Sequence, residues 1–106
     1  MKYIITAIYD LKSKQYGYLQ TVTSLVESER TLIATMEKGN NNIAKFPQDF
    51  QLFKMADYDL TSGEITPLPK PILICNAIDH ASAITPPVHK DDQILQEHFG
   101  VEKTKN

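Results

Sequence analysis

β-branched and aromatic residues dominate positions 2–9, so both alternating faces of this segment are largely apolar. Such residues favour β-strands, and a strand that is apolar on both faces is typical of the interior of a sheet. Residues 10–15 are polar and residues 16–22 can return as a second strand, which predicts a hairpin. One face of the first strand would carry Tyr3, Ile5, Ala7 and Tyr9, and the other Ile4, Thr6 and Ile8.

The spacing of apolar residues changes to that of a helix over residues 24–38. Ser24 stands three positions before Glu27, the spacing of a capping box, in which each side chain binds a free backbone N–H of the other residue. Gly39 follows and can end the helix in a left-handed conformation. The expected apolar stripe comprises Leu25, Leu32, Ile33 and Met36.

The second half of the chain predicts further strands separated by turns. The expected elements are a turn or short helical entry over 46–50, a strand over 51–58, a turn over 59–63, a brief return strand over 64–66 and a final strand over 72–78. Three alternating prolines exclude a central position for the segment that contains them, Pro67 to Pro71. The fold class that follows is α+β, a mainly antiparallel sheet of four to five strands with the helix over 24–38 packed on one face.

A length of 106 residues fits one domain, which we assign to residues 1–80. Residues 81–106 form a C-terminal extension, partly ordered or flexible, in which Asp91 or Asp92 can cap a short helix. Its apolar side would carry Ile94, Leu95 and Phe99. No apolar run approaches the roughly 18–20 residues of a membrane span. The single cysteine and the lack of a signal peptide favour a reducing, cytoplasmic setting.

Candidate catalytic and metal-binding residues each have a simpler structural explanation. Cys75 lies in an apolar strand, where burial makes a thiol inert. The three histidines, His80, His89 and His98, are nine residues apart and do not form a zinc signature with one cysteine. Asp57 and Asp59 could hold a cation, but a solvated hairpin end also explains them. The sequence has no phosphate-binding loop and no nucleophile motif. We therefore expect that the protein is not an enzyme and has no catalytic residue, metal or cofactor.

The charge distribution and the tyrosines point towards a nucleic-acid partner. The net charge is −2. Residues 1–54 hold seven basic and five acidic groups, whereas residues 55–106 hold four basic and eight acidic ones. Tyrosines in the first hairpin alternate with lysines, and exposed rings stack on bases while lysines neutralise phosphates. An ordinary mixed surface, with tyrosines in the core and at its rim, is the alternative.

Short motifs follow one another in a fixed order along residues 1–79. They are Met1-Lys2, Ile8-Tyr9-Asp10, Lys12, Tyr16, Glu29-Arg30, Lys45-Phe46-Pro47-Gln48-Asp49-Phe50-Gln51-Leu52-Phe53, Tyr58-Asp59, Thr61-Ser62-Gly63 and Asn76-Ala77-Ile78. In this order they resemble the small non-structural DNA-binding protein family of gokushoviruses, a branch of the single-stranded DNA microviruses. The family usually shows a Pro-acid-Asp-aromatic run, and Gln48 departs from it at the acidic position.

The resemblance implies a viral accessory protein that acts on the phage genome during replication or packaging, in the host cell cytoplasm. Together with the charge asymmetry and the tyrosines, it predicts a protein that binds DNA, single-stranded and without sequence preference. For a chain of net charge −2, polyanion binding requires either a local basic face from residues 1–54 or a homodimer that joins two such faces, and we expect a homodimer. The alternative is an adaptor that recruits viral or host replication proteins, or capsid-assembly factors, without DNA contact. The expected DNA-binding residues are Lys2, Lys12, Lys14, Tyr16, Tyr18, Arg30, Lys38 and Lys45.

Overall fold

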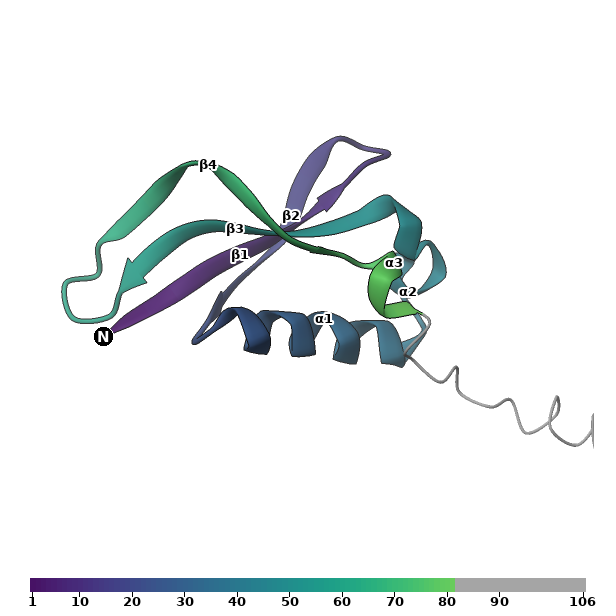
Figure 1. Ribbon diagram of the computed structural model, residues 1–106, viewed down its shortest axis with the longest axis horizontal. Helices are drawn as coiled ribbons and strands as arrows, with labels where there is room; N and C mark the ends of the chain where they lie inside the picture. The colour runs from purple at the N-terminus through teal and green to yellow at the C-terminus, as the bar shows by residue number, and fades with distance from the viewer. Residues whose placement is uncertain (82–106) are drawn as a thin grey trace, which may run out of the picture.

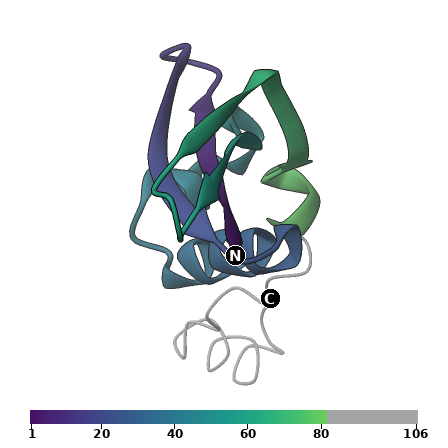
Figure 2. The ribbon, with the colours of Figure 1, turned by 90° about the vertical axis from the view of Figure 1, so that its left-hand side faces the viewer.

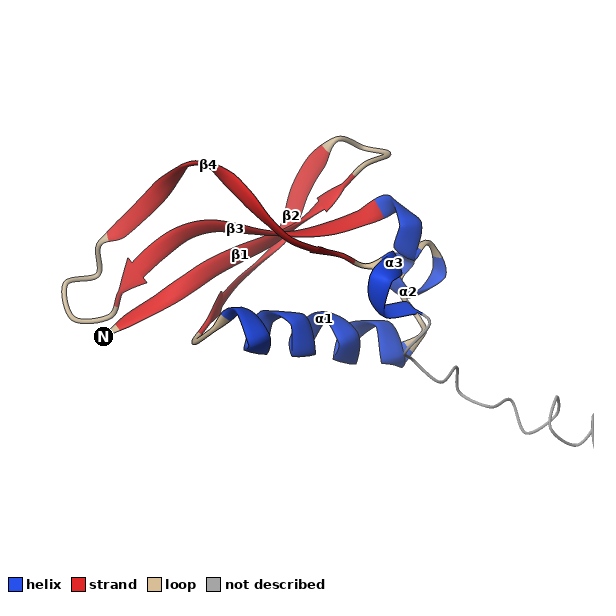
Figure 3. Cartoon of the chain, in the orientation of Figure 1, coloured by secondary structure: helices blue, strands red, loops and turns tan. Residues whose placement is uncertain are grey.

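The computed structural model describes residues 1–81 as a four-stranded antiparallel sheet with helices, and residues 82–106 lie outside the described part (Figures 1 and 3). The strand order is β2-β1-β3-β4, and every neighbouring pair is antiparallel. The α+β class and the antiparallel sheet are therefore confirmed. The predicted tail helix with Ile94, Leu95 and Phe99 falls outside the described residues. The strands are β1 (Lys2–Asp10), β2 (Gln15–Val22), β3 (Phe50–Asp59) and β4 (Ile65–Asn76).

The first strand lies inside the sheet, between β2 and β3, as its two apolar faces predict. Four consecutive residues of β1, from Ile5 to Ile8, are buried, so side chains on both of its faces are shielded from water. In a strand, successive side chains point to opposite faces, and burial of both is the property of a central strand.

Helix α1 (Leu25–Lys38) begins and ends where the local sequence predicts. The Ser24 side chain accepts a hydrogen bond from the Glu27 N–H at 3.1 Å, and Gly39 ends the helix with a φ of 77°. The second half of the predicted capping box differs, because the Glu27 carboxylate accepts from the N–H and hydroxyl of Thr23 instead of the Ser24 N–H. Three short helices follow: α2 (Asn42–Lys45), the 3₁₀ helix η1 (Pro47–Asp49) and α3 (Ile78–Ala81).

The main core joins α1 to the sheet, which lies above the helix in Figures 1 and 2. Its α1 residues come from the second half of the helix, and the predicted Leu25 is wrong as a core residue because it is 43% exposed in the first turn. The buried stripe of α1 instead repeats every four residues, through Ser28, Leu32 and Met36. The core cluster comprises Ile8, Leu32, Met36, Ile43, Phe50, Leu52 and Ala77.

The fourth strand corrects the prediction of two short strands at 64–66 and 72–78. It is one 12-residue edge strand, and it accommodates prolines because an edge strand does not need every N–H for pairing. Its register with β3 jumps from Pro67 to Ile72 while β3 advances only from Ala56 to Lys54. Residues 68–71 therefore have no ladder partner, and Figure 1 shows β4 bent along its length.

Among residues 1–81, no helix has the length and apolar character needed to cross a lipid bilayer.

Candidate functional site

The turn between β1 and β2 is organised by Asp10. Its side-chain Oδ1 accepts hydrogen bonds from the N–H groups of Lys12 at 2.9 Å and Ser13 at 3.3 Å. Its main-chain carbonyl accepts from the Lys14 N–H at 2.7 Å. Closing the turn in this way places Lys14 in the left-handed region, with a φ of 60°. Lysine rarely adopts this conformation, because its Cβ crowds the backbone there.

The turn between β3 and β4 repeats the same arrangement. Tyr58-Asp59-Leu60-Thr61-Ser62-Gly63-Glu64 corresponds to Tyr9-Asp10-Leu11-Lys12-Ser13-Lys14-Gln15. Asp59 Oδ1 accepts hydrogen bonds from the N–H groups of Thr61 at 2.8 Å and Ser62 at 3.3 Å. The Asp59 main-chain carbonyl accepts from the Gly63 N–H at 2.8 Å. Gly63 takes the left-handed position with a φ of 78°, where a glycine has no steric cost. The first turn carries a lysine at the position where the second carries glycine.

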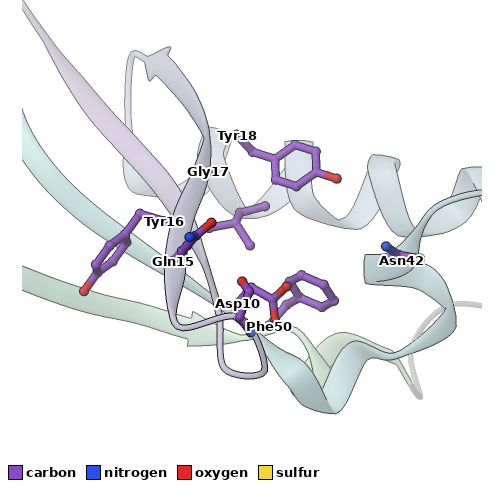
Figure 4. A pocket seen from close by; sticks show the side chains of 9 residues that line it. Asp10, Gln15, Tyr16, Gly17, Tyr18, Asn42 and Phe50 are labelled. Atoms are coloured by element: carbon purple, nitrogen blue, oxygen red, sulfur yellow. Dashed lines mark hydrogen bonds between the residues drawn. The ribbon is translucent and has the colours of Figure 1, made fainter.

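Tyr18 is the second non-glycine residue with a left-handed backbone among residues 1–81, with a φ of 52°. It lies at a β-bulge, where the register between β1 and β2 shifts between Thr6 and Ile8. Residues two apart on a regular strand share a face, but the bulge breaks this rule. Figure 4 shows the Tyr16 and Tyr18 rings on opposite sides of β2.

Tyr16 packs into a cluster of three rings. Its ring centroid lies 4.7 Å from that of Tyr9 and 5.6 Å from that of Phe53, in tilted and edge-to-face arrangements. Such contacts fix the Tyr16 ring while leaving 45% of the residue exposed. Tyr18 is 57% exposed and belongs to no ring pair among the described residues. Of the two tyrosines that the sequence singles out, Tyr18 is therefore the freer stacking surface.

A groove lies between the β1–β2 hairpin and the segment formed by α2 and η1. It consists of two neighbouring cavities of about 170 and 280 Å³ that share Asp10, Asn42 and Phe50. Figure 4 shows Tyr18 and Asn42 beside the smaller cavity and Asp10 with Phe50 at its base. Phe46, 49% exposed, lines the larger cavity. Neither Asn42 nor Phe46 was among the expected DNA-binding residues, because α2 and the hairpin meet only in the folded chain.

The groove has an acidic floor. The hydrogen bond from the Lys12 N–H is the main cause of a lowered pKa at Asp10; burial opposes it, and the backbone and side chain of Ser13 lower the pKa further. Asp10 thus stays ionised at neutral pH, and Asp49 lines the larger cavity together with Lys12. Carboxylates repel phosphate and accept hydrogen bonds from amino groups, so the floor suits the amino edge of a base better than a phosphate.

The structure brings together only part of the expected DNA-binding set. Four of its residues lie on the hairpin, where residues 11–21 are all exposed, and Lys45 ends α2 beside the groove residue Asn42. Lys2 lies at the opposite end of β1, about 26 Å from Asp10 at roughly 3.3 Å per residue. Arg30 and Lys38 are exposed on α1 and line neither cavity. The hairpin residues are Lys12, Lys14, Tyr16 and Tyr18.

A second group of chemically active side chains lies away from the groove. Glu29 of α1, Cys75 of β4 and His80 of α3 place one ligand atom each within 4.8 Å of the others. Burial raises the pKa of the Cys75 thiol to about 11, with the charges of Glu29 and Asp79 adding to the effect. The spacings of cysteine and histidine along the chain do not predict that these three residues meet, because they come from three separate elements.

The fold and the hairpin define a small α+β protein built on an open four-stranded sheet, with lysines and exposed tyrosines on one edge hairpin. The chain belongs to the Phage ORF5 protein family, whose model matches residues 3–80. The match covers both hairpins, the groove and all three members of the Glu29, Cys75 and His80 group. No curated protein and no solved structure matches the chain.

Proposed function

We propose that this phage protein binds single-stranded DNA through the β1–β2 hairpin and its groove, without reading sequence. The observation that carries the proposal is the pair of strained residues in this hairpin, Lys14 and Tyr18, whose side chains suit a nucleic acid. In this proposal the protein is a non-structural accessory factor of gokushovirus type. It acts without catalysis on the phage genome during replication or packaging, in the host cell cytoplasm.

Backbone strain supports the assignment. A left-handed conformation costs a non-glycine residue about 1–2 kcal/mol. Neither side chain recovers this by burial, since Lys14 and Tyr18 are both exposed, and Lys14 forms no ion pair within residues 1–81. Strain of this kind concentrates at functional sites. A positively charged group at the hairpin tip and a ring beside the groove are what a single strand requires.

The groove divides the contacts with DNA by chemistry. The rings of Tyr18 and Phe46 offer stacking surfaces for bases, and Asp10 with Asn42 can accept hydrogen bonds from base amino groups. Lys12 and Lys14 at the turn are left to neutralise phosphates along the rim. Both cavities are smaller than the roughly 300–1,000 Å³ of enclosed small-molecule sites, which favours an open strand over a buried ligand.

Removing the Tyr18 ring tests the stacking contact. Asparagine tolerates a left-handed backbone, so Tyr18→Asn keeps the bulge and deletes the ring. We expect affinity for fluorescent oligothymidine, measured by anisotropy at low salt, to fall about 10- to 100-fold, the value of one base stacked on a ring. The control is Leu60→Asn, a 40% exposed residue of the other turn, with unchanged affinity. Equal affinity of wild type and Tyr18→Asn would contradict the proposed contact.

The repeated turn provides a test of the lysines at constant net charge. Lys12→Thr with Lys14→Gly gives the first turn the sequence of the second, Leu-Thr-Ser-Gly, and should weaken binding strongly. Adding Thr61→Lys with Gly63→Lys moves both charges to the other turn. We expect this fourfold variant to bind as weakly as the double variant. If the fourfold variant recovered wild-type affinity, DNA would be attracted by the charge of the protein as a whole, and the proposed interface at the β1–β2 hairpin would be wrong.

The homodimer remains part of the proposal, because two hairpins would double the basic surface of a chain with net charge −2. The competing function is an adaptor for viral or host replication proteins through residues 81–106. Deleting those residues separates the two, since DNA affinity persists if the hairpin is the interface. Absence of DNA binding by the full chain, even at low salt, would leave the adaptor as the better proposal.

A further inference from the structure

The fold gathers three potential metal ligands from elements far apart in the chain. Glu29 lies in the first half of α1, Cys75 near the end of β4 and His80 in α3. Their carboxylate oxygen, sulfur and ring nitrogen all lie within 4.8 Å of one another, and each residue is partly buried. We propose that Glu29, Cys75 and His80 bind a zinc ion.

The distances suit a tetrahedral ion. Zinc bonds of about 2.0–2.3 Å at tetrahedral angles keep ligand atoms roughly 3.3–3.7 Å apart. His80 Nε2 lies 3.2 Å from Glu29 Oε2, which is close to this spacing. The sulfur must approach by little more than 1 Å at most to complete it, since all separations are within 4.8 Å. Side-chain rotation of Cys75 can supply a movement of this size.

The state of His80 gives a second, independent observation. Its Nε2 atom is buried and has no hydrogen-bond partner among residues 1–81. The 3.2 Å approach to Glu29 satisfies the distance of an ion pair but not the alignment of a hydrogen bond. A buried polar atom without a partner is rare, and a bound ion is one of its recognised explanations. Here the unpartnered nitrogen lies next to the carboxylate and the thiol that would share the ion.

The chemistry of the three groups selects the metal. A thiolate with an imidazole and a carboxylate suits zinc, whereas magnesium and calcium prefer oxygen ligands alone. Three protein ligands leave a fourth position for water or another group. Cys75 of the edge strand β4 and Ala81 of α3 pack against the main core. An ion held by Glu29, Cys75 and His80 would therefore connect α1, β4 and α3 beside that core. Metal binding at such a junction adds to folding stability.

Cobalt titration of the full chain, stripped of metal by a chelator, tests the site. Thiolate ligation gives Co²⁺ a charge-transfer absorption that other ligands of this protein cannot produce. We expect one equivalent of Co²⁺ to generate this absorption, one equivalent of Zn²⁺ to abolish it, and Zn²⁺ to raise the Tm. Absence of the thiolate absorption at one equivalent would overturn the proposal.

Single substitutions assign the ligands. Cys75→Ser, His80→Gln and Glu29→Gln should each lower zinc affinity at least about 100-fold, because even outer groups around a metal contribute 10- to 100-fold. The matched control is Asp79→Asn, which removes a neighbouring charge outside the group and should keep one equivalent. Circular dichroism without metal checks folding, and Glu29→Gln, at a side chain 35% exposed, is the mildest of the three. If each of the three single variants still bound one equivalent of zinc with the affinity of the wild type, the assignment would be overturned.

Discussion

Lys14 and Gly63 occupy the same position of two equivalent turns, and they allow the strain in the first turn to be measured. Replacing Lys14 with glycine removes a steric cost of about 1–2 kcal/mol and adds roughly 0.5–1 kcal/mol of unfolded-chain entropy. We therefore expect Lys14→Gly to raise the free energy of unfolding by about 0.5–1 kcal/mol in urea denaturation. The same variant should bind DNA more weakly, so stability and function would change in opposite directions.

The reverse substitution at Gly63 is the control for this effect. Gly63→Lys places a side chain at a φ of 78°, and open space around the glycine leaves backbone strain as the cause of any loss. A drop of about 1 kcal/mol is expected. A Lys14→Gly variant no more stable than the wild type, together with a neutral Gly63→Lys, would show that these turns tolerate lysine without strain.

The two turns also predict how the hairpins respond to acid. Donation by the backbone N–H of Thr61, and then of Ser62, lowers the pKa of Asp59, as the Lys12 N–H does for Asp10. A lowered pKa means that the stabilisation is complete above the unfolded pKa, near 3.9, and is lost as pH falls through the folded value. Asp59→Asn keeps an acceptor oxygen but cannot titrate. Its unfolding free energy should therefore decline less than that of wild type between about pH 5 and about pH 2.5, and an equal decline would contradict this origin.

The elements show which features a sequence can predict. The cap at Ser24, the end at Gly39 and the interior position of β1 follow from local hydrogen bonds and from burial on two faces. The bulge in β2 is not predictable from the sequence, because nothing near Tyr18 indicates its left-handed backbone. Without the bulge, a two-residue spacing would place Tyr16 and Tyr18 on the same face of the strand. The groove beside Phe46 and the meeting of Glu29, Cys75 and His80 depend on tertiary packing, which no spacing along the chain reveals.

For the molecule as a whole, the salt dependence of binding reports how many lysines meet phosphate and how many chains meet one strand. At the hairpin end each chain offers Lys12, Lys14 and Lys45, and log affinity for single strands falls with log salt by about 0.7 per phosphate neutralised. A monomer should therefore give a slope near −2 and a homodimer on one strand a slope near −4. Light scattering of the complex gives its mass, which shows whether one or two protein chains are bound and therefore which slope is expected.

The variant with Lys12→Thr and Lys14→Gly should reduce the magnitude of the slope by about 1.4 per protein chain. A slope that does not change in this variant would place the phosphate contacts elsewhere on the protein, because the removed charges could not have released the counterions.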